Sequence, residues 1–257
     1  MFARRHHNSN VSEADLCTVK RIAASVLLCV AFTTTSAQLA KQGQQIAAQG
    51  TSQGVAACIS CHGAKGEGMG AFPRLAGTGE AYLLAQLDAF ANGARKNAIK
   101  QPIAQGLQPV ERQAVAMYFS QLRAPLLAVD LKQPLTSDTG AWLATRGRWA
   151  DQVPACTQCH GPGGSGVGAQ FPPLAGLPAA YIAEQLQAWK EGNRPPGPLA
   201  LMAGVAKKLS DAEITAVAAY YENIALPKRT GIPDVPGAAG APGVMNPAAP
   251  TQTKGAP

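Results

Sequence analysis

The sequence predicts an all-α protein that is built from two tandem copies of one small domain. Apolar residues recur with helical spacing, and no stretch alternates convincingly with a period of two residues. Segments of the first half return in the same order in the second half, with Cys58 and Cys156 standing 98 positions apart. Only 5% of the residues are aromatic, so a unit of this size has a thin core unless a bound group adds apolar bulk.

The duplication is visible in four pairs of segments. Four kinds of segment occur once in each half: a glycine-rich loop, a Phe-Pro-x-Leu-Ala-Gly stretch, a Tyr-bearing helical stretch and a closing helical stretch. The pairs are 63–68 with 161–166, 72–77 with 171–176, 81–87 with 180–186, and 114–119 with 216–221. Such a long period indicates a duplicated domain rather than a solenoid of short repeats.

Helices are expected wherever apolar residues fall on one face. These positions are Leu83, Leu87 and Phe90 in the first half, and Ile182, Leu186 and Trp189 in the second. Ser210 and Glu213 form a capping-box pattern at the start of the last helix, where the first half has Gln108, a poorer cap. We expect three to four helices in each half.

Composition and charge exclude several classes of protein. Charged residues make up only 14% of the chain, and the formal net charge is +7. The basic residues are scattered and form no run, which argues against a nucleic-acid partner. The longest apolar run, 22–32, is too short to span a bilayer, so no transmembrane segment is expected.

The first 37 residues are interpreted as an export signal. Lys20 and Arg21 precede the apolar run 22–32, and small residues follow up to Ala37. This order of charge, apolar run and small residues is typical of a cleaved secretory signal. It favours that interpretation over the alternative, a buried helix. We therefore expect a periplasmic protein that begins near Gln38.

The remaining chain divides into four segments. They are a first domain at 38–125, a linker at 126–138 with Pro134, a second domain at 139–228, and a disordered tail at 229–257 that is rich in Pro, Gly and Ala.

Two Cys-x-x-Cys-His motifs carry the chemistry of the chain. They are Cys58, Cys61 and His62 in the first half, and Cys156, Cys159 and His160 in the second. Together they account for every cysteine and histidine beyond the export signal. This pentapeptide attaches c-type haem, because two thioethers reach the two vinyl groups of the porphyrin and the next residue places an imidazole under the iron. The sequence therefore predicts two covalently bound haem groups.

Other uses of the four cysteines explain less. A zinc ion held by all four cysteines leaves both histidines without a role. A redox-active dithiol of the thioredoxin kind needs a βαβ context that is absent. A disulfide framework, which export otherwise favours, does not account for the histidines.

With these motifs the chain resembles the two-haem class I cytochromes of the cytochrome c4 family. The resemblance rests on the two Cys-x-x-Cys-His units, each followed by Phe-Pro-x-Leu-Ala-Gly and a Tyr-bearing helix, and it covers roughly 40–226. It implies two tandem class I cytochrome c domains, each with three to four helices around a covalent haem.

The resemblance also implies the axial ligands. His62 and His160 are the proximal ligands, and Met202 in Leu201-Met202-Ala203-Gly204 is the distal ligand of the second iron. Histidine and methionine ligation raises the reduction potential. The carbonyl groups of Pro73 and Pro172 are expected to accept hydrogen bonds from the proximal imidazoles, which orients the rings.

The first half departs from this pattern, because Lys100 stands where the alignment places Met202. Four arrangements remain open for the first iron: Lys100 as distal ligand, Met69, Met117, or no ligand from the protein. We expect Lys100, with a lower potential for the first haem than for the second.

The resemblance implies a periplasmic electron carrier and no enzyme. It implies redox-protein partners, with electrons passing from a dehydrogenase or quinol-oxidising complex to a terminal oxidase, and at most a peripheral association with the membrane. Two alternatives remain: a two-haem oxidoreductase such as a thiosulfate dehydrogenase that uses the first haem, and a cytochrome subunit of a membrane dehydrogenase. No catalytic residue is assigned.

Overall fold

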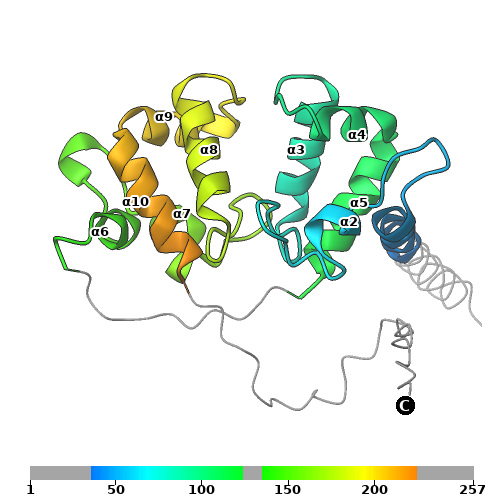
Figure 1. The fold of residues 1–257 in the computed structure, drawn as a ribbon, viewed down its shortest axis with the longest axis horizontal. Helices are drawn as coiled ribbons and strands as arrows, with labels where there is room; N and C mark the ends of the chain where they lie inside the picture. The colour runs from blue at the N-terminus through cyan, green and yellow to red at the C-terminus, as the bar shows by residue number, and fades with distance from the viewer. Residues whose placement is uncertain (1–35, 124–134, 225–257) are drawn as a thin grey trace, which may run out of the picture. The chain divides into compact units, whose positions relative to one another are not determined.

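The computed structural model describes residues 36–123 and 135–224, which form two halves of similar helical architecture (Figure 1). These residues contain helices and isolated bridges but no strand, as the all-α prediction requires. None of the described helices has the length and apolar character needed to cross a bilayer. Most of the expected export signal, most of the expected linker and the expected tail at 229–257 lie outside the described residues.

Each half contains five α-helical segments within the described residues, and they follow in the same order. In the first half they are 36–49, α2 (Ile59–His62), α3 (Glu80–Ala91), α4 (Lys100–Gly106) and α5 (Pro109–Gln121). In the second half they are α6 (Thr139–Thr145), α7 (Thr157–His160), α8 (Ala179–Lys190), α9 (Leu201–Lys207) and α10 (Asp211–Glu222). The second half also has the short 3-10 helices η1 (Trp149–Asp151), η2 (Pro162–Gly164) and η3 (Pro198–Ala200). The expected three to four helices correspond to the longer segments, because α2 and α7 are single turns.

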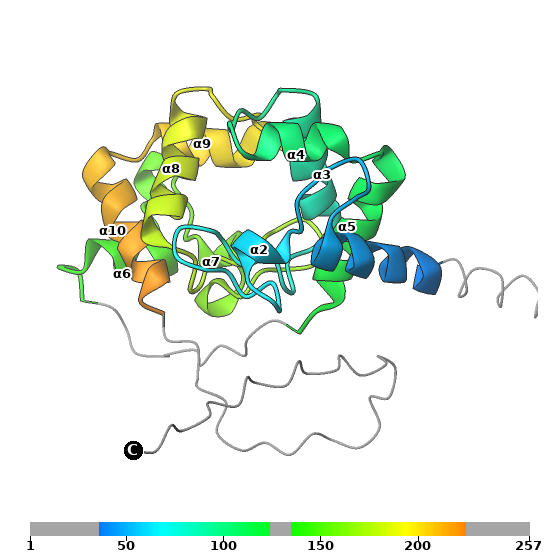
Figure 2. The ribbon, with the colours of Figure 1, turned by 45° about the vertical axis from the view of Figure 1, so that its right-hand side comes forward.

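The first half is closed by packing of α3 against α4 and α5, and of the 36–49 helix against α5 (Figure 2). The 36–49 helix approaches α5 closely, since a Cβ atom on Gly43 would lie 2.0 Å from the carbonyl oxygen of Ala114. The buried core of this half is small, and its side chains are aliphatic apart from the ring of Phe119. It contains Ile46, Val55, Leu83, Leu107, Val115 and Phe119.

The second half repeats this packing. α10 packs against α6 and α8, and α9 packs against α8. Gly140 allows the same close approach, because a Cβ atom there would lie 2.3 Å from the carbonyl oxygen of Ala216. The two helices that close each half therefore meet through a glycine in both copies.

The last helix of each half starts in the same way. The hydroxyl of Ser210 accepts from the N–H of Glu213 (3.2 Å), and the Glu213 carboxylate accepts from the N–H of Ser210 (2.8 Å). At the start of α5 the Glu111 carboxylate accepts from the N–H of Gln108 (2.7 Å). Gln108 thus starts a helix although it is a poorer cap than serine.

Candidate functional site

The two one-turn helices α2 and α7 present the Cys-x-x-Cys-His motifs. Cys58 and Cys156 occupy the N-cap positions with helical backbone angles, and the N–H groups of His62 and His160 donate back to their carbonyls at 3.0 and 2.9 Å. One helical turn therefore carries both cysteines and the histidine of each motif. The four cysteines of the two motifs are free of disulfide bonds.

Both imidazoles are buried and oriented by a backbone carbonyl. The Nδ1 atoms of His62 and His160 lie 2.7 Å from the carbonyl oxygens of Pro73 and Pro172, respectively. Each of the two histidines is 5% exposed. Because a carbonyl only accepts, Nδ1 carries the proton and Nε2 keeps its lone pair, which is the arrangement of a metal-binding histidine.

Burial keeps these imidazoles neutral. It lowers the pKa of His62 to about 4, against a smaller opposing effect of the hydrogen bond to Pro73, and it lowers the pKa of His160 in the same way. The Nε2 atom of His160 is buried and has no hydrogen-bond partner. A buried nitrogen without a partner is rare in a folded protein, so this atom requires a ligand.

The motifs face one continuous cavity of about 640 Å³ that both halves line. Its walls include Cys58 and His62 from the first half, and Cys156 and His160 from the second. Most of the wall is apolar, which suits a large flat apolar group.

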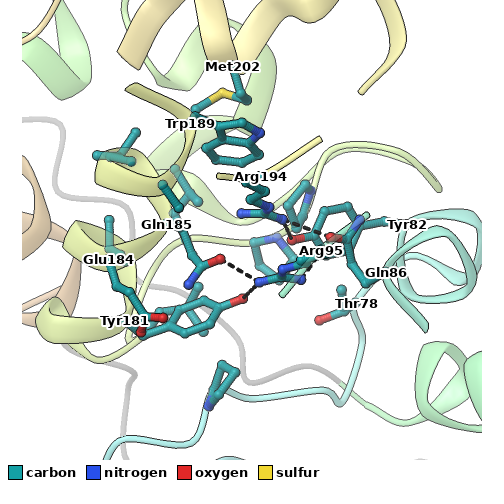
Figure 3. A pocket seen from close by; sticks show the side chains of 18 of the residues that line it. Thr78, Tyr82, Gln86, Arg95, Tyr181, Glu184, Gln185, Trp189, Arg194 and Met202 are labelled. Carbon is teal, nitrogen blue, oxygen red and sulfur yellow. Dashed lines mark hydrogen bonds between the residues drawn. The ribbon is translucent and has the colours of Figure 1, made fainter. Parts of the chain in front are cut away.

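Arg95 extends from the first half to the second across this cavity (Figure 3). Its guanidinium group stacks over the ring of Phe90, 4.5 Å from the centroid. It donates to Gln86 in its own half, and to Tyr181 and Gln185 in the second half. The side chain is 7% exposed, and none of these partners carries a negative charge.

Arg194 makes the reciprocal connection from the second half. It stacks over the ring of Trp189 at 3.7 Å and donates to the hydroxyl of Tyr82 and the carbonyl oxygen of the Gln86 side chain, both at 2.9 Å. It is 5% exposed. The N–H of Tyr82 also donates to the carbonyl of Ala169 (2.9 Å), so the two halves are joined by backbone as well as side-chain hydrogen bonds.

Three buried arginines line the otherwise mostly apolar cavity. Arg74, Arg95 and Arg194 are all buried, none of them forms an ion pair with a described residue, and the Nε atom of Arg74 has no hydrogen-bond partner. Burial lowers the pKa of Arg74 and of Arg194. Buried charges without an opposite charge beside them are costly, so these guanidinium groups suit anions inside the cavity.

The residues present therefore fit covalently bound haem. Its ring suits the apolar walls, its iron suits the unpartnered His160 Nε2, its vinyl groups suit the free thiols, and its carboxylates suit the buried arginines.

Met202 and Lys100 lie at equivalent places in the two halves. Met202 is in the first turn of α9, half-buried, and packs against the second core beside Trp189 (Figure 3). Lys100 is the first residue of α4, half-buried, and its N–H donates to Asn97 (2.9 Å). Both side chains line the cavity.

The environment of Lys100 places it close to the first motif. Burial lowers the pKa of Lys100, and the nearby thiols of Cys58 and Cys61 oppose this effect. The two methionines considered for the first iron, Met69 and Met117, are not among the residues that line the cavity, and Met69 is 53% exposed.

The family model for cytochrome c matches residues 40–123, which cover most of the first half, and residues 152–225, which cover the second half from α7 to α10 but not α6. The chain belongs to the cytochrome c family. It is 36% identical over 172 residues to cytochrome c4 from Pseudomonas aeruginosa, with 66% of this chain and 84% of that protein covered. A solved structure of reduced recombinant cytochrome c4 from Pseudomonas stutzeri has a TM-score of 0.61 and 35% identity, and covers 72% of this chain and 98% of that chain. This protein is thus a two-haem class I cytochrome of the c4 type.

Two further relatives have names that refer to thiosulfate dehydrogenase. A protein of Stutzerimonas stutzeri (strain A1501) named "Thiosulfate dehydrogenase electron acceptor" is 47% identical over 195 residues, which are 75% of this cytochrome and 90% of that protein. The structure of the thiosulfate dehydrogenase TsdBA from Marichromatium purpuratum has a TM-score of 0.65 and 40% identity over 77% of this cytochrome. This cytochrome spans only 44% of that chain.

The reciprocal arginines were not predicted from the sequence. Arg95 and Arg194 follow a glycine by two residues in both halves, in Gly93-Ala94-Arg95 and Gly192-Asn193-Arg194. This repeated Gly-x-Arg pattern was the sequence signal that could have marked the two arginines as equivalent residues. The role of the two residues depends on contacts between the halves, which the repeat within a single sequence does not specify.

Replacing Met202 by alanine tests the assignment of the second iron's distal ligand. The oxidised cytochrome is expected to lose the weak far-red band that methionine ligation of ferric haem produces, because alanine has no thioether. Absorbance spectra of the oxidised protein measure this band. Met69→Ala is the matched control and should keep it, and a band that survives in Met202→Ala would assign the ligand to another methionine.

Proposed function

We propose that this cytochrome is a periplasmic electron carrier that accepts electrons from a dehydrogenase acting on thiosulfate and passes them towards a terminal oxidase. Covalently bound haem supplies reversible one-electron chemistry at each motif. The observation that carries the proposal is the single cavity lined by both motifs, because it brings two redox sites into one apolar space. No substrate chemistry of the chain itself is required.

The residues of the chain hold and orient the redox groups. Cys58, Cys61, Cys156 and Cys159 form the thioether attachments, while His62 and His160 provide the proximal nitrogen atoms. The carbonyls of Pro73 and Pro172 keep the protons on the Nδ1 atoms. The apolar walls exclude water, which limits the rearrangement of solvent when an electron arrives.

The donor is inferred from the relatives and from the chemistry of the site. Two relatives at 47% and 46% identity carry the name "Thiosulfate dehydrogenase electron acceptor", and the shorter of these matches covers 77% of that relative. Every histidine beyond the export signal is committed to an iron in this proposal, which leaves no histidine for substrate chemistry. A role as acceptor therefore suits the chain better than a role as the dehydrogenase.

A reduction experiment separates carrier from enzyme. The purified oxidised cytochrome is mixed with thiosulfate alone, and then with thiosulfate and a catalytic amount of a thiosulfate dehydrogenase. We expect reduction of both haems, seen as the sharp α-band, only when the dehydrogenase is present. Rapid reduction by thiosulfate alone would support the alternative of a two-haem oxidoreductase that uses the first haem. No reduction in either mixture, in a protein that dithionite reduces, would refute the proposed donor.

A further inference from the structure

The two halves differ at one fully buried position of the closing helix. Tyr221 in α10 is 1% exposed and lines the cavity, and its hydroxyl oxygen has no hydrogen-bond partner. The equivalent residue of α5 is Phe119, which is also 1% exposed and also lines the cavity.

The two rings fill equivalent places. A Cβ atom on Gly66 would lie 2.8 Å from Cε1 of Phe119, and a Cβ atom on Gly164 would lie 2.5 Å from Cε1 of Tyr221. The carbonyl of Phe119 accepts from the N–H of Gly77 (2.9 Å), and that of Tyr221 accepts from the N–H of Gly176 (2.7 Å). Packing alone is therefore satisfied by phenylalanine, and the hydroxyl is the difference.

A buried hydroxyl without a partner destabilises the folded chain relative to a phenylalanine of the same shape. The thiol of Cys156 lies close enough to this hydroxyl for the two groups to interact. His160 Nε2 is another buried polar atom of this half without a hydrogen-bond partner, and His160 lines the same cavity. One bound group that contacts the Tyr221 hydroxyl and His160 Nε2 would give each of these atoms a partner.

We propose that the Tyr221 hydroxyl is a hydrogen-bond donor to the Cys156 attachment of the second haem and raises the reduction potential of that haem above the potential of the first. This proposal depends on the two-haem electron carrier proposed above. Tyr221 acts here as a positioning and tuning residue and not as an iron ligand.

The direction follows from electrostatics. A donated hydrogen bond directs the positive end of the hydroxyl dipole at the thioether sulfur, which is a weak acceptor. Positive potential beside the macrocycle stabilises the ferrous form, which carries one electron more than the ferric form. In a low-dielectric cavity the effect is stronger than in water. Hydrogen bonding around the haem is one of the ways in which a protein sets its potential. The first half has no hydroxyl at this position.

The experiment uses Tyr221→Phe, which installs the first half's own residue, and the reciprocal Phe119→Tyr. Spectroelectrochemical titration of the full two-haem protein should show the higher step of Tyr221→Phe moved to lower potential, with the lower step unchanged. Phe119→Tyr should move the lower step to higher potential. Tyr220→Phe removes the neighbouring hydroxyl and should move neither step.

Single-haem proteins assign the steps. In Cys58→Ser/Cys61→Ser, which keeps the second haem, adding Tyr221→Phe should lower the one remaining step. Unchanged potentials in Tyr221→Phe with both haems attached would overturn this inference and leave the electron carrier intact, as would equal shifts of both steps. Absence of attached haem in the wild type would instead overturn the proposed function itself.

Discussion

A variant in which Cys58 and Cys61 are both replaced by serine is expected to keep one covalent haem in place of two. Serine forms no thioether, so the first haem loses its attachment, while the motif on α7 is untouched. The haem content per chain, measured by the pyridine haemochrome spectrum, should fall by half. A denaturing gel stained for haem peroxidase activity should still show a band at the monomer mass.

The reciprocal variant Cys156→Ser/Cys159→Ser is the matched control and should also keep one haem. The four-serine protein should show no stain. We also expect both double variants to be less stable than the wild type, because an apolar cavity shared by both halves loses one of the groups that fill it. An unstained wild-type protein, produced in a host that matures c-type cytochromes, would refute the assignment of both motifs.

Much of the fold could be predicted from local patterns. The helices α3 and α8 follow the apolar spacing of Leu83 and Phe90 and of Ile182 and Leu186, and these four side chains are buried. The start of α10 at Ser210 follows from the capping box. Such features depend on residues three or four positions apart, which a single sequence shows directly.

The sequence was less informative where structure depends on distant residues. The one-turn helices α2 and α7 have no periodicity to detect, because each is four residues long. The contacts of Arg95 and Arg194 join residues about 90 to 110 positions apart, so no local pattern shows them. The unpartnered hydroxyl of Tyr221 is visible only when its surroundings are known, since tyrosine and phenylalanine fit the same helical pattern.

The two halves carry different residues at the start of the short helices α4 and α9. α4 and α9 pack in the same way, against α3 and α8, and their first turns carry Lys100 and Met202. Both side chains line the cavity, and Met69 and Met117 do not. We therefore propose Lys100 as the distal ligand of the first iron, in place of the thioether that Met202 provides to the second. Loss of a thioether lowers the potential, so the protein should titrate in two separated steps with the first haem lower.

Replacing Lys100 by methionine should make the first site resemble the second. The lower step of the redox titration is expected to move up towards the higher step, and the far-red methionine band of the oxidised protein should roughly double in intensity. Spectroelectrochemical titration with absorbance spectra of both haems measures the two effects together. Lys65→Met is the control, because Lys65 is exposed and is not among the residues that line the cavity, and it should leave the band and both steps unchanged. If the wild type already shows two methionine-ligated haems of similar potential, a methionine such as Met69 or Met117 has reached the first iron and the assignment of Lys100 is wrong.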